Sequence, residues 1–248
     1  MTKILMVGDS HGNLAFMEHI IHVAEYNKIK TVVQLGDFGF IWPGADNELA
    51  ALNEIANEHS IKIVFIPGNH EDWDSLDYYH AKAEKELSYD VDGFIPILSN
   101  IVYTGKTHQW EWDGLIFTAV GGAYSIDYAL REYGRSIWVQ ETLTEEDLLR
   151  VESFETTDVL LTHDAPTWAP FRNLYDDIES HIHRQKMNRV QLALLPSVWF
   201  HGHYHTKMTY EDYITKVYGL NCDGAWDESN YMIFDTKTAM KRREINGT

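Results

Sequence analysis

Five short segments of the sequence place aspartate, asparagine or histidine beside glycine or threonine. They read Gly8-Asp9-Ser10-His11, Gly36-Asp37, Gly68-Asn69-His70-Glu71, Thr162-His163-Asp164 and Gly202-His203-Tyr204-His205. Carboxylate and imidazole groups suit zinc, manganese and iron, and no cysteine adjoins these segments to indicate a closed structural zinc site. One segment alone would be explained as a cap or a turn. Five in succession predict a metal site, in which two ions and a bridging carboxylate could hold a hydroxide and a phosphoryl group.

Each of these segments follows a short apolar run of the kind that forms a buried strand. The five runs are 3–7, 31–35, 61–66, 158–161 and 197–200, and helix-like stretches span 14–26 and 46–59. The first part of the chain therefore has its strands and helices in the order βαβαβ, which predicts parallel strands. Ligands bind just beyond the carboxyl ends of such strands. We therefore expect the five polar segments to meet at those ends.

The middle and the tail of the chain add strands in a different arrangement. Strand-like runs at 94–98, 101–104, 107–112 and 115–120 are separated by short breaks, which favours antiparallel pairs. A capped helix is expected at 144–154, and further strand-like runs lie at 207–213, 216–221 and 231–235. Because no stretch has the composition of a linker, the sequence predicts one domain over residues 1–248 with an α/β fold, two sheets with helices outside.

The five segments resemble the sequence blocks of the calcineurin-like metallophosphoesterase superfamily, and the small bacterial and phage members are the most similar. The blocks are Gly-Asp-x-His, Gly-Asp, Gly-Asn-His-Asp/Glu, a lone His and Gly-His-x-His, and they occur here in that order from Asp9 to His205. The resemblance implies a four-layer αββα sandwich of two mixed β-sheets flanked by helices. It also implies two divalent transition-metal ions as cofactors, namely manganese, iron, zinc or nickel, with manganese favoured.

The same resemblance assigns a role to each matching residue. Asp9, His11 and His205 would bind one metal ion, Asn69, His163 and His203 the other, and Asp37 would lie between the two. His70 would be the catalytic histidine, which stabilises the transition state or protonates the leaving oxygen. Glu71 or Asp164 is expected to orient His70 through a hydrogen bond.

Three aromatic residues follow the second block. The chain continues from Asp37 as Phe38-Gly39-Phe40-Ile41-Trp42, and it lacks the arginine that grips phosphate in phosphoprotein phosphatases. These aromatic rings could wall the site and stack on a nucleobase or aryl group, and Trp42 is the candidate for substrate binding. Core packing explains at least two of the three rings equally well.

A glycine pair at 121–122 would let the following segment fold over the metal site. Tyr124 and Arg131 are then candidates for substrate binding. Arg131 or Arg135 could supply the missing grip on phosphate, and a surface salt bridge is the alternative for either arginine. The remaining histidines are interpreted as ordinary helix, strand or loop residues, His22 and His59 among them. His181 and His183 are expected in an exposed helix or loop.

The residues favour a binuclear phosphodiesterase whose metal-bridging hydroxide attacks the phosphorus of a small diester, such as a cyclic nucleotide or an aryl or nucleotidyl diester. One alternative is a phosphomonoesterase or phosphoprotein phosphatase. Another is a non-catalytic, metal-bound scaffold that binds a protein partner. The complete set of blocks, including His70, counts against the scaffold.

Charge and composition restrict the partners further. The sequence has 38 acidic and 20 basic residues, a formal charge of -18, which disfavours extended nucleic acid and anionic membrane surfaces. A small phosphorylated substrate is compatible, because a pocket can be locally cationic. The apolar run at 3–7 is too short for a signal peptide, and the single Cys222 permits no internal disulfide, so we expect a cytoplasmic protein. Nothing in the sequence indicates an oligomeric state.

Overall fold

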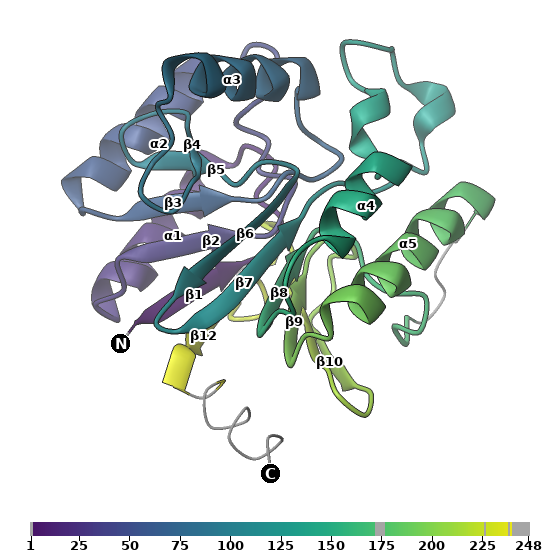
Figure 1. The fold of residues 1–248 in the computed structure, drawn as a ribbon. Coiled ribbons are helices and arrows are strands. Elements are labelled where there is room, and N and C mark those ends of the chain that lie inside the picture. The colour runs from purple at the N-terminus through teal and green to yellow at the C-terminus, as the bar shows by residue number, and fades with distance from the viewer. Residues whose placement is uncertain (1, 172–176, 226, 238, 240–248) are drawn as a thin grey trace.

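The computed structural model describes residues 2–171, 177–225, 227–237 and 239, which form two six-stranded β-sheets with helices on their outer faces (Figure 1). In spatial order, the first sheet holds β12 (Tyr231–Asp235), β1 (Lys3–Val7), β2 (Thr31–Gln34), β3 (Lys62–Phe65), β5 (Ile101–Tyr103) and β4 (Ile95–Pro96). The second holds β10 (Met208–Glu211), β11 (Lys216–Gly219), β9 (Val198–His201), β8 (Val159–Thr162), β7 (Leu115–Val120) and β6 (Thr107–Trp112).

The two sheets share one pattern of strand directions. In the first sheet β1, β2, β3 and β5 run parallel, and the edge strands β12 and β4 are antiparallel to their neighbours. In the second sheet β11, β9, β8 and β7 run parallel, and the edge strands β10 and β6 are antiparallel. The expected sandwich of two mixed sheets is therefore confirmed. The parallel strands present their carboxyl ends together, as a strand-end site requires.

Five α-helices of the described chain cover the outer faces of the sheets. Helices α1 (Leu14–Tyr26), α2 (Asp46–Glu58) and α3 (Trp73–Glu86) lie on the first sheet, and α4 (Glu145–Glu152) and α5 (Ile178–Leu194) lie on the second (Figure 1). The connection from β7 to α4 contains two short 3-10 helices, Tyr128–Leu130 and Val139–Glu141. No helix in the described ranges has the length and apolarity needed to cross a membrane.

The helices expected at 14–26, 46–59 and 144–154 are all present. Helix α5 lies where a helix or a loop was expected around His181 and His183, whereas α3 was not predicted. Helix α4 begins with the capping box that its sequence indicates, because Thr144 and Asp147 exchange hydrogen bonds. Helix α3 buries only three side chains. The buried face of α5 includes polar residues such as Arg184 and Gln191. Both helices therefore bury few apolar side chains for their length, which weakens the pattern by which a helix is predicted.

The core has three layers because strands such as β1 are buried on both faces. Ile4 and Met6 pack between the two sheets, whereas Leu5 and Val7 pack against the helices of the first sheet. A third cluster lies between the second sheet and helices α4 and α5. Burial on both faces explains why the central strands read as continuous apolar runs.

Candidate metal centre

The seven predicted metal ligands follow the carboxyl ends of parallel strands in both sheets. Asp9 comes two residues after β1, Asp37 follows β2, Asn69 follows β3, His163 directly follows β8, and His203 follows β9. His11 and His205 lie two residues beyond Asp9 and His203. The structure brings these side chains into two neighbouring groups.

The outer group consists of Asp9, His11 and His205. Each offers one ligand atom, and these atoms lie within 4.8 Å of one another. His205 Nε2 is 3.1 Å from Asp9 Oδ2, and the rings of His11 and His205 have centroids 5.0 Å apart. The Asp9 side chain is buried, but the His11 side chain is 30% exposed and that of His205 is 47% exposed. Solvent therefore reaches this group directly.

The inner group consists of Asp37, Asn69, His163 and His203. Ligand atoms of Asp37, His163 and His203 again lie within 4.8 Å of one another. His163 Nε2 is 3.2 Å from Asp37 Oδ1 and 3.1 Å from Asn69 Oδ1. Asp37, Asn69 and His163 are almost completely buried. This group combines imidazole with carboxylate and amide oxygen in a site largely closed to solvent.

Asp37 lies between the two groups. One of its oxygens, Oδ1, is 3.2 Å from His163 Nε2, while the other, Oδ2, is 3.7 Å from His11 Nε2 in the outer group. Oδ1 also accepts a hydrogen bond of 2.8 Å from the main-chain N–H of His70. A carboxylate with one oxygen toward each group has the placement that a bridging ligand needs.

The charges of the two groups fit bound cations. Although burial alone lowers the pKa of His163, the carboxylates of Asp37 and Asp9 raise it to about 10. His11 behaves in the same way, because Asp37, Asp9 and Asp223 outweigh burial and raise its pKa to about 10. Without metal, protons on these imidazoles compensate the buried carboxylates. Divalent ions held by the same oxygen and nitrogen donors would do so instead.

Glycines at strand ends of one sheet make room for predicted ligands of the other sheet. A Cβ atom on Gly36 would lie 2.2 Å from His163 Nδ1, and one on Gly202 would lie 2.2 Å from Asp9 Oδ1. Several ligands also have left-handed backbone angles, with φ of 52° at Asp37 and 67° at His203. Non-glycine residues rarely adopt such angles, so the surrounding structure must hold these backbones in place.

Asp223 supports the outer group and was not predicted from the sequence. Its Oδ1 lies 2.8 Å from His11 Nδ1, and its Oδ2 accepts a 2.8 Å hydrogen bond from Asn13 Nδ2. This contact leaves Nε2 of His11 directed toward Asp37. In the inner group, His163 Nδ1 instead lies 2.8 Å from the main-chain carbonyl of Leu35. Asp223 follows the parallel strand β11, so the rule of strand ends could have identified it.

Ser125 and Glu141 support the inner group and were also missed. Asn69 Nδ2 donates to Ser125 Oγ at 3.0 Å, and Ser125 Oγ donates to Glu141 Oε2 at 2.7 Å. Glu141 Oε1 accepts from the main-chain N–H of Trp138 at 3.0 Å. Burial raises the pKa of Glu141 to about 7, against the effect of these hydrogen bonds. No local motif marks this pair, because both residues lie in the irregular connection between β7 and α4.

His70 is half-buried beside Asp37 and is contacted by Arg131. The Arg131 Nη2 donates to His70 Nε2 at 2.7 Å, and its Nε forms an ion pair with Asp127 at 2.8 Å. Burial lowers the pKa of His70, and the charge of Arg131 lowers it further against the opposing effect of Asp37. The ring of Trp42 lies 6.2 Å from that of His70. Two of the predicted substrate residues therefore adjoin the predicted catalytic histidine.

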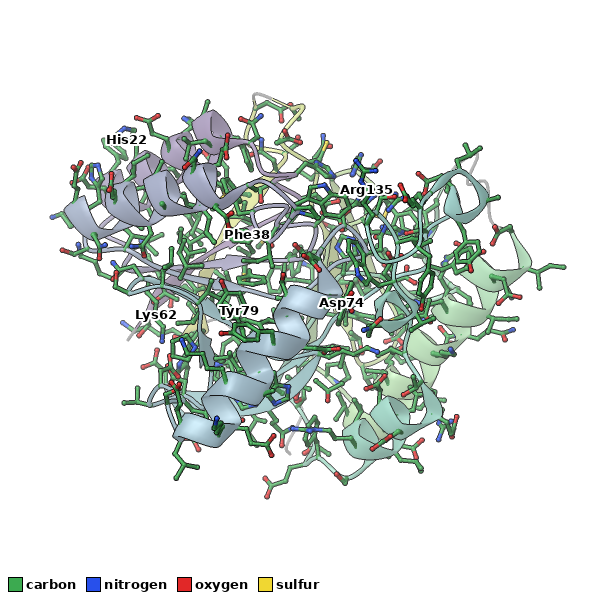
Figure 2. All side chains as sticks on the ribbon, turned by 90° about the horizontal axis from the view of Figure 1, so that it is seen from above. His22, Phe38, Lys62, Asp74, Tyr79 and Arg135 are labelled. Carbon is green, nitrogen blue, oxygen red and sulfur yellow. The ribbon has the colours of Figure 1, made fainter. Side chains whose placement is uncertain are left out.

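The other candidates near the site have different surroundings. Tyr124 is partly buried, and its ring stacks on that of Tyr128 with centroids 6.4 Å apart. Arg135 lies in the connection before α4 (Figure 2), and its side chain is 75% exposed and pairs with Glu132 at 3.1 Å. Phe38 and Phe40 are buried in the core, so packing explains these two rings. Only Arg131, of the two arginines, contacts a predicted site residue.

Glu71 does not orient His70. Its carboxylate instead accepts main-chain hydrogen bonds from Phe38 at 2.7 Å and from Gly39 at 3.2 Å. Burial raises the pKa of Glu71 to about 8, although these hydrogen bonds oppose the rise. Its contacts show that Glu71 fixes the loop after Asp37.

Asp164 does not contact His70 either. It lies 2.6 Å from His183 Nδ1 and accepts a hydrogen bond from Tyr204 at 2.6 Å. The expectation that His183 is exposed was wrong, because this residue is buried and its Nε2 accepts the main-chain N–H of Leu143. His183 therefore attaches α5 to the loop of His163 through Asp164 and to the segment before α4 through Leu143, and Asp164 also contacts the loop of His203 through Tyr204.

A cavity of about 700 Å³ lies between α3, the turn after β5 and the start of α4. Its lining includes Trp73, Tyr103, Lys106 and Asp147 but none of the predicted metal ligands. The predicted metal ligands at the strand ends therefore lie outside the lining of this cavity.

The fold and the cluster of donors are those of a metallophosphoesterase. The chain belongs to the calcineurin-like phosphoesterase family, whose model matches residues 2–207. Members of this family are metallophosphoesterases, which hydrolyse phosphate esters with the help of divalent metal ions.

Several solved structures share this fold at low sequence identity. TT1561 of Thermus thermophilus has a TM-score of 0.55 and 13% identity, and the alignment covers 96% of each chain. A dimetal phosphatase from Danio rerio has a TM-score of 0.54 and 11% identity, over 90% of this chain and 88% of its own. The phosphopantetheinyl hydrolase of Mycobacterium tuberculosis has a TM-score of 0.54 and 13% identity, over 94% and 96% of the two chains. No curated protein matches the sequence.

Proposed function

We propose that this protein is a binuclear metal-dependent phosphodiesterase that hydrolyses a diester of a small molecule. The observation that carries the proposal is the placement of Asp37, with one oxygen toward the inner group and the other toward the outer group. The outer group would hold one ion and the inner group the other. Mixed carboxylate, amide and imidazole donors suit manganese, iron, zinc or nickel, and we favour manganese because three of the seven ligands are oxygen donors.

Two ions in these positions would neutralise charge on the phosphoryl oxygens and lower the pKa of a water molecule. His70 is the proposed catalytic residue, next to Asp37. Its depressed pKa favours the neutral imidazole, and Nε2 accepts a hydrogen bond from Arg131, so Nδ1 carries the proton. His70 and Arg131 together can donate hydrogen bonds to a phosphate ester as charge develops on its oxygens.

The charge balance of the site supports a diester. A phosphodiester carries one negative charge at neutral pH, whereas a monoester carries close to two. Arg131 is the only arginine that contacts a predicted site residue within the described chain, and the protein has a formal charge of -18. The stacked rings of Tyr124 and Tyr128 lie on the same connection as Arg131, where they could contact an aryl group or a nucleobase.

A rate assay on the manganese-loaded protein tests this function. We expect turnover of bis-p-nitrophenyl phosphate and slower turnover of mono-p-nitrophenyl phosphate. Faster monoester hydrolysis would instead indicate a phosphomonoesterase. Two bound ions without turnover of either compound would favour the non-catalytic scaffold.

The same assay, applied to variants, tests the roles proposed for His70 and Arg131. His70→Ala should retain both metal ions and lose about 10²- to 10³-fold in kcat, because a positioned hydrogen-bond donor to the phosphate ester is removed. Arg131→Ala should raise KM for the diester, whereas the exposed Arg135→Ala is the matched control and should leave KM unchanged. Equal kinetics of the two arginine variants would remove Arg131 from the substrate site.

A further inference from the structure

Three further ligand-type side chains converge on the surface, away from the candidate metal centre. His59 Nδ1 lies 2.9 Å from Glu25 Oε2, and His22 Nδ1 lies 4.0 Å from the same oxygen. The rings of His22 and His59 have centroids 5.0 Å apart, and one ligand atom from each of the three residues lies within 4.8 Å of the others. Two imidazoles and a carboxylate are the donor set of many three-ligand zinc sites.

Helices fix the positions of these residues. His22 and Glu25 are three residues apart on α1, so they share one face of that helix. His59 is the C-cap of α2, where its main-chain N–H bonds the carbonyl of Ile55 at 3.2 Å. His22 is about 12 Å along α1 from Leu14, the residue at the end nearer the metal centre. Figure 2 shows His22 at the edge of the molecule, apart from Phe38, which follows Asp37.

The location also favours a cation electrostatically. Both α1 and α2 end beside these residues, and neither last turn contains lysine or arginine. A helix carries partial negative charge at its C-terminus, so two such ends meet here without a helical cation to offset them. Lys30 is one nearby cation, and its Nζ donates to the main-chain carbonyl of His59 at 3.1 Å. Its charge is thus directed at the backbone rather than at the imidazoles.

We propose that His22, Glu25 and His59 form a binding site for a borderline divalent metal ion such as zinc, which links the end of α1 to the end of α2. This inference is independent of the proposed phosphodiesterase activity. Ligand atoms of one tetrahedral zinc ion lie about 3.3 Å apart. The 4.0 Å separation of His22 Nδ1 from Glu25 Oε2 must therefore shorten, and the 2.9 Å separation of His59 Nδ1 from the same oxygen must lengthen slightly. The His22 side chain is 55% exposed and that of Glu25 is 54% exposed, which leaves both free to rotate inward. Water would complete the coordination.

Equilibrium dialysis of the full chain against micromolar zinc tests this site by counting bound metal. The double variant His22→Ala/His59→Ala should bind about one zinc ion per chain fewer than the wild type. The matched control His19→Ala/His80→Ala removes two other exposed histidines, and it should bind as much zinc as the wild type. The test compares the zinc content of each variant with that of the wild type, so the number of ions bound at the proposed catalytic centre does not affect the result.

Two further measurements separate this site from the metal centre. Turnover of bis-p-nitrophenyl phosphate should be the same in the wild type and the double variant. Glu25→Gln, which preserves the size of the side chain, should weaken zinc binding at this site at least about tenfold. Added zinc should raise the Tm of the wild type more than that of either variant. Equal zinc content in the wild type and the double variant, or equal affinity in Glu25→Gln, would overturn the proposal.

Discussion

The two groups of predicted ligands differ in burial and in what holds them. In the inner group Asp37, Asn69 and His163 are buried, and a main-chain carbonyl fixes the ring of His163. In the outer group two of the three side chains are exposed, and the ring of His11 is fixed by a side chain, Asp223. Hydrogen-bonded partners of this kind tune the affinity of a metal ligand. From this difference we expect that the proposed inner ion is held tightly and that the proposed outer ion exchanges more readily.

The largest effect is expected where both groups meet, at Asp37. In Asp37→Asn one oxygen becomes an amide nitrogen, so one group loses its donor and both lose the shared charge. We expect less than two bound ions per chain and a loss of at least about 10⁴-fold in kcat/KM, because the charge-neutralising centre is incomplete. Metal analysis and diester turnover measure the two quantities. Full occupancy in this variant would show that Asp37 does not join the groups.

Asp223→Asn tests the support of the outer group alone. The variant keeps the shape of the side chain but removes the charge beside His11 Nδ1. The outer ion should bind about 10- to 100-fold more weakly while the inner ion is retained. Titration with manganese after removal of metal would show one unchanged and one weakened binding step. If both steps weakened equally, the two groups would not be independent.

Ser125→Ala should have the smallest effect. It removes the side-chain hydrogen bond to Asn69, but the main-chain contact that fixes His163 remains. We expect both ions to stay bound and kcat to fall about 5-fold, in line with the loss of one hydrogen bond. The same metal titration and diester assay measure both values. Loss of the inner ion in this variant would contradict the asymmetry, because the inner group would then depend on side-chain support as the outer group does.

The fold and the position of the site could be predicted because both follow from strand ends. Apolar runs buried on both faces mark the central strands, and parallel strands bring residues as distant as Asp9 and His203 together. Ser125 and Glu141 could not be predicted in the same way, since they belong to an irregular connection with no periodicity. His183 was misassigned because its partner, Asp164, is 19 residues earlier and the buried face of α5 includes several polar residues.

The glycines at the strand ends have a consequence beyond the turns that they permit. Gly36 leaves space for His163 of the other sheet, and Gly202 leaves space for Asp9, also across the sandwich. A methyl group added at either glycine would therefore displace a donor that is remote in sequence. A substitution at Gly36 or Gly202 would therefore require a compensating change at the ligand that it contacts in the other sheet. Contacts between the sheets thus limit which substitutions the chain tolerates at this centre.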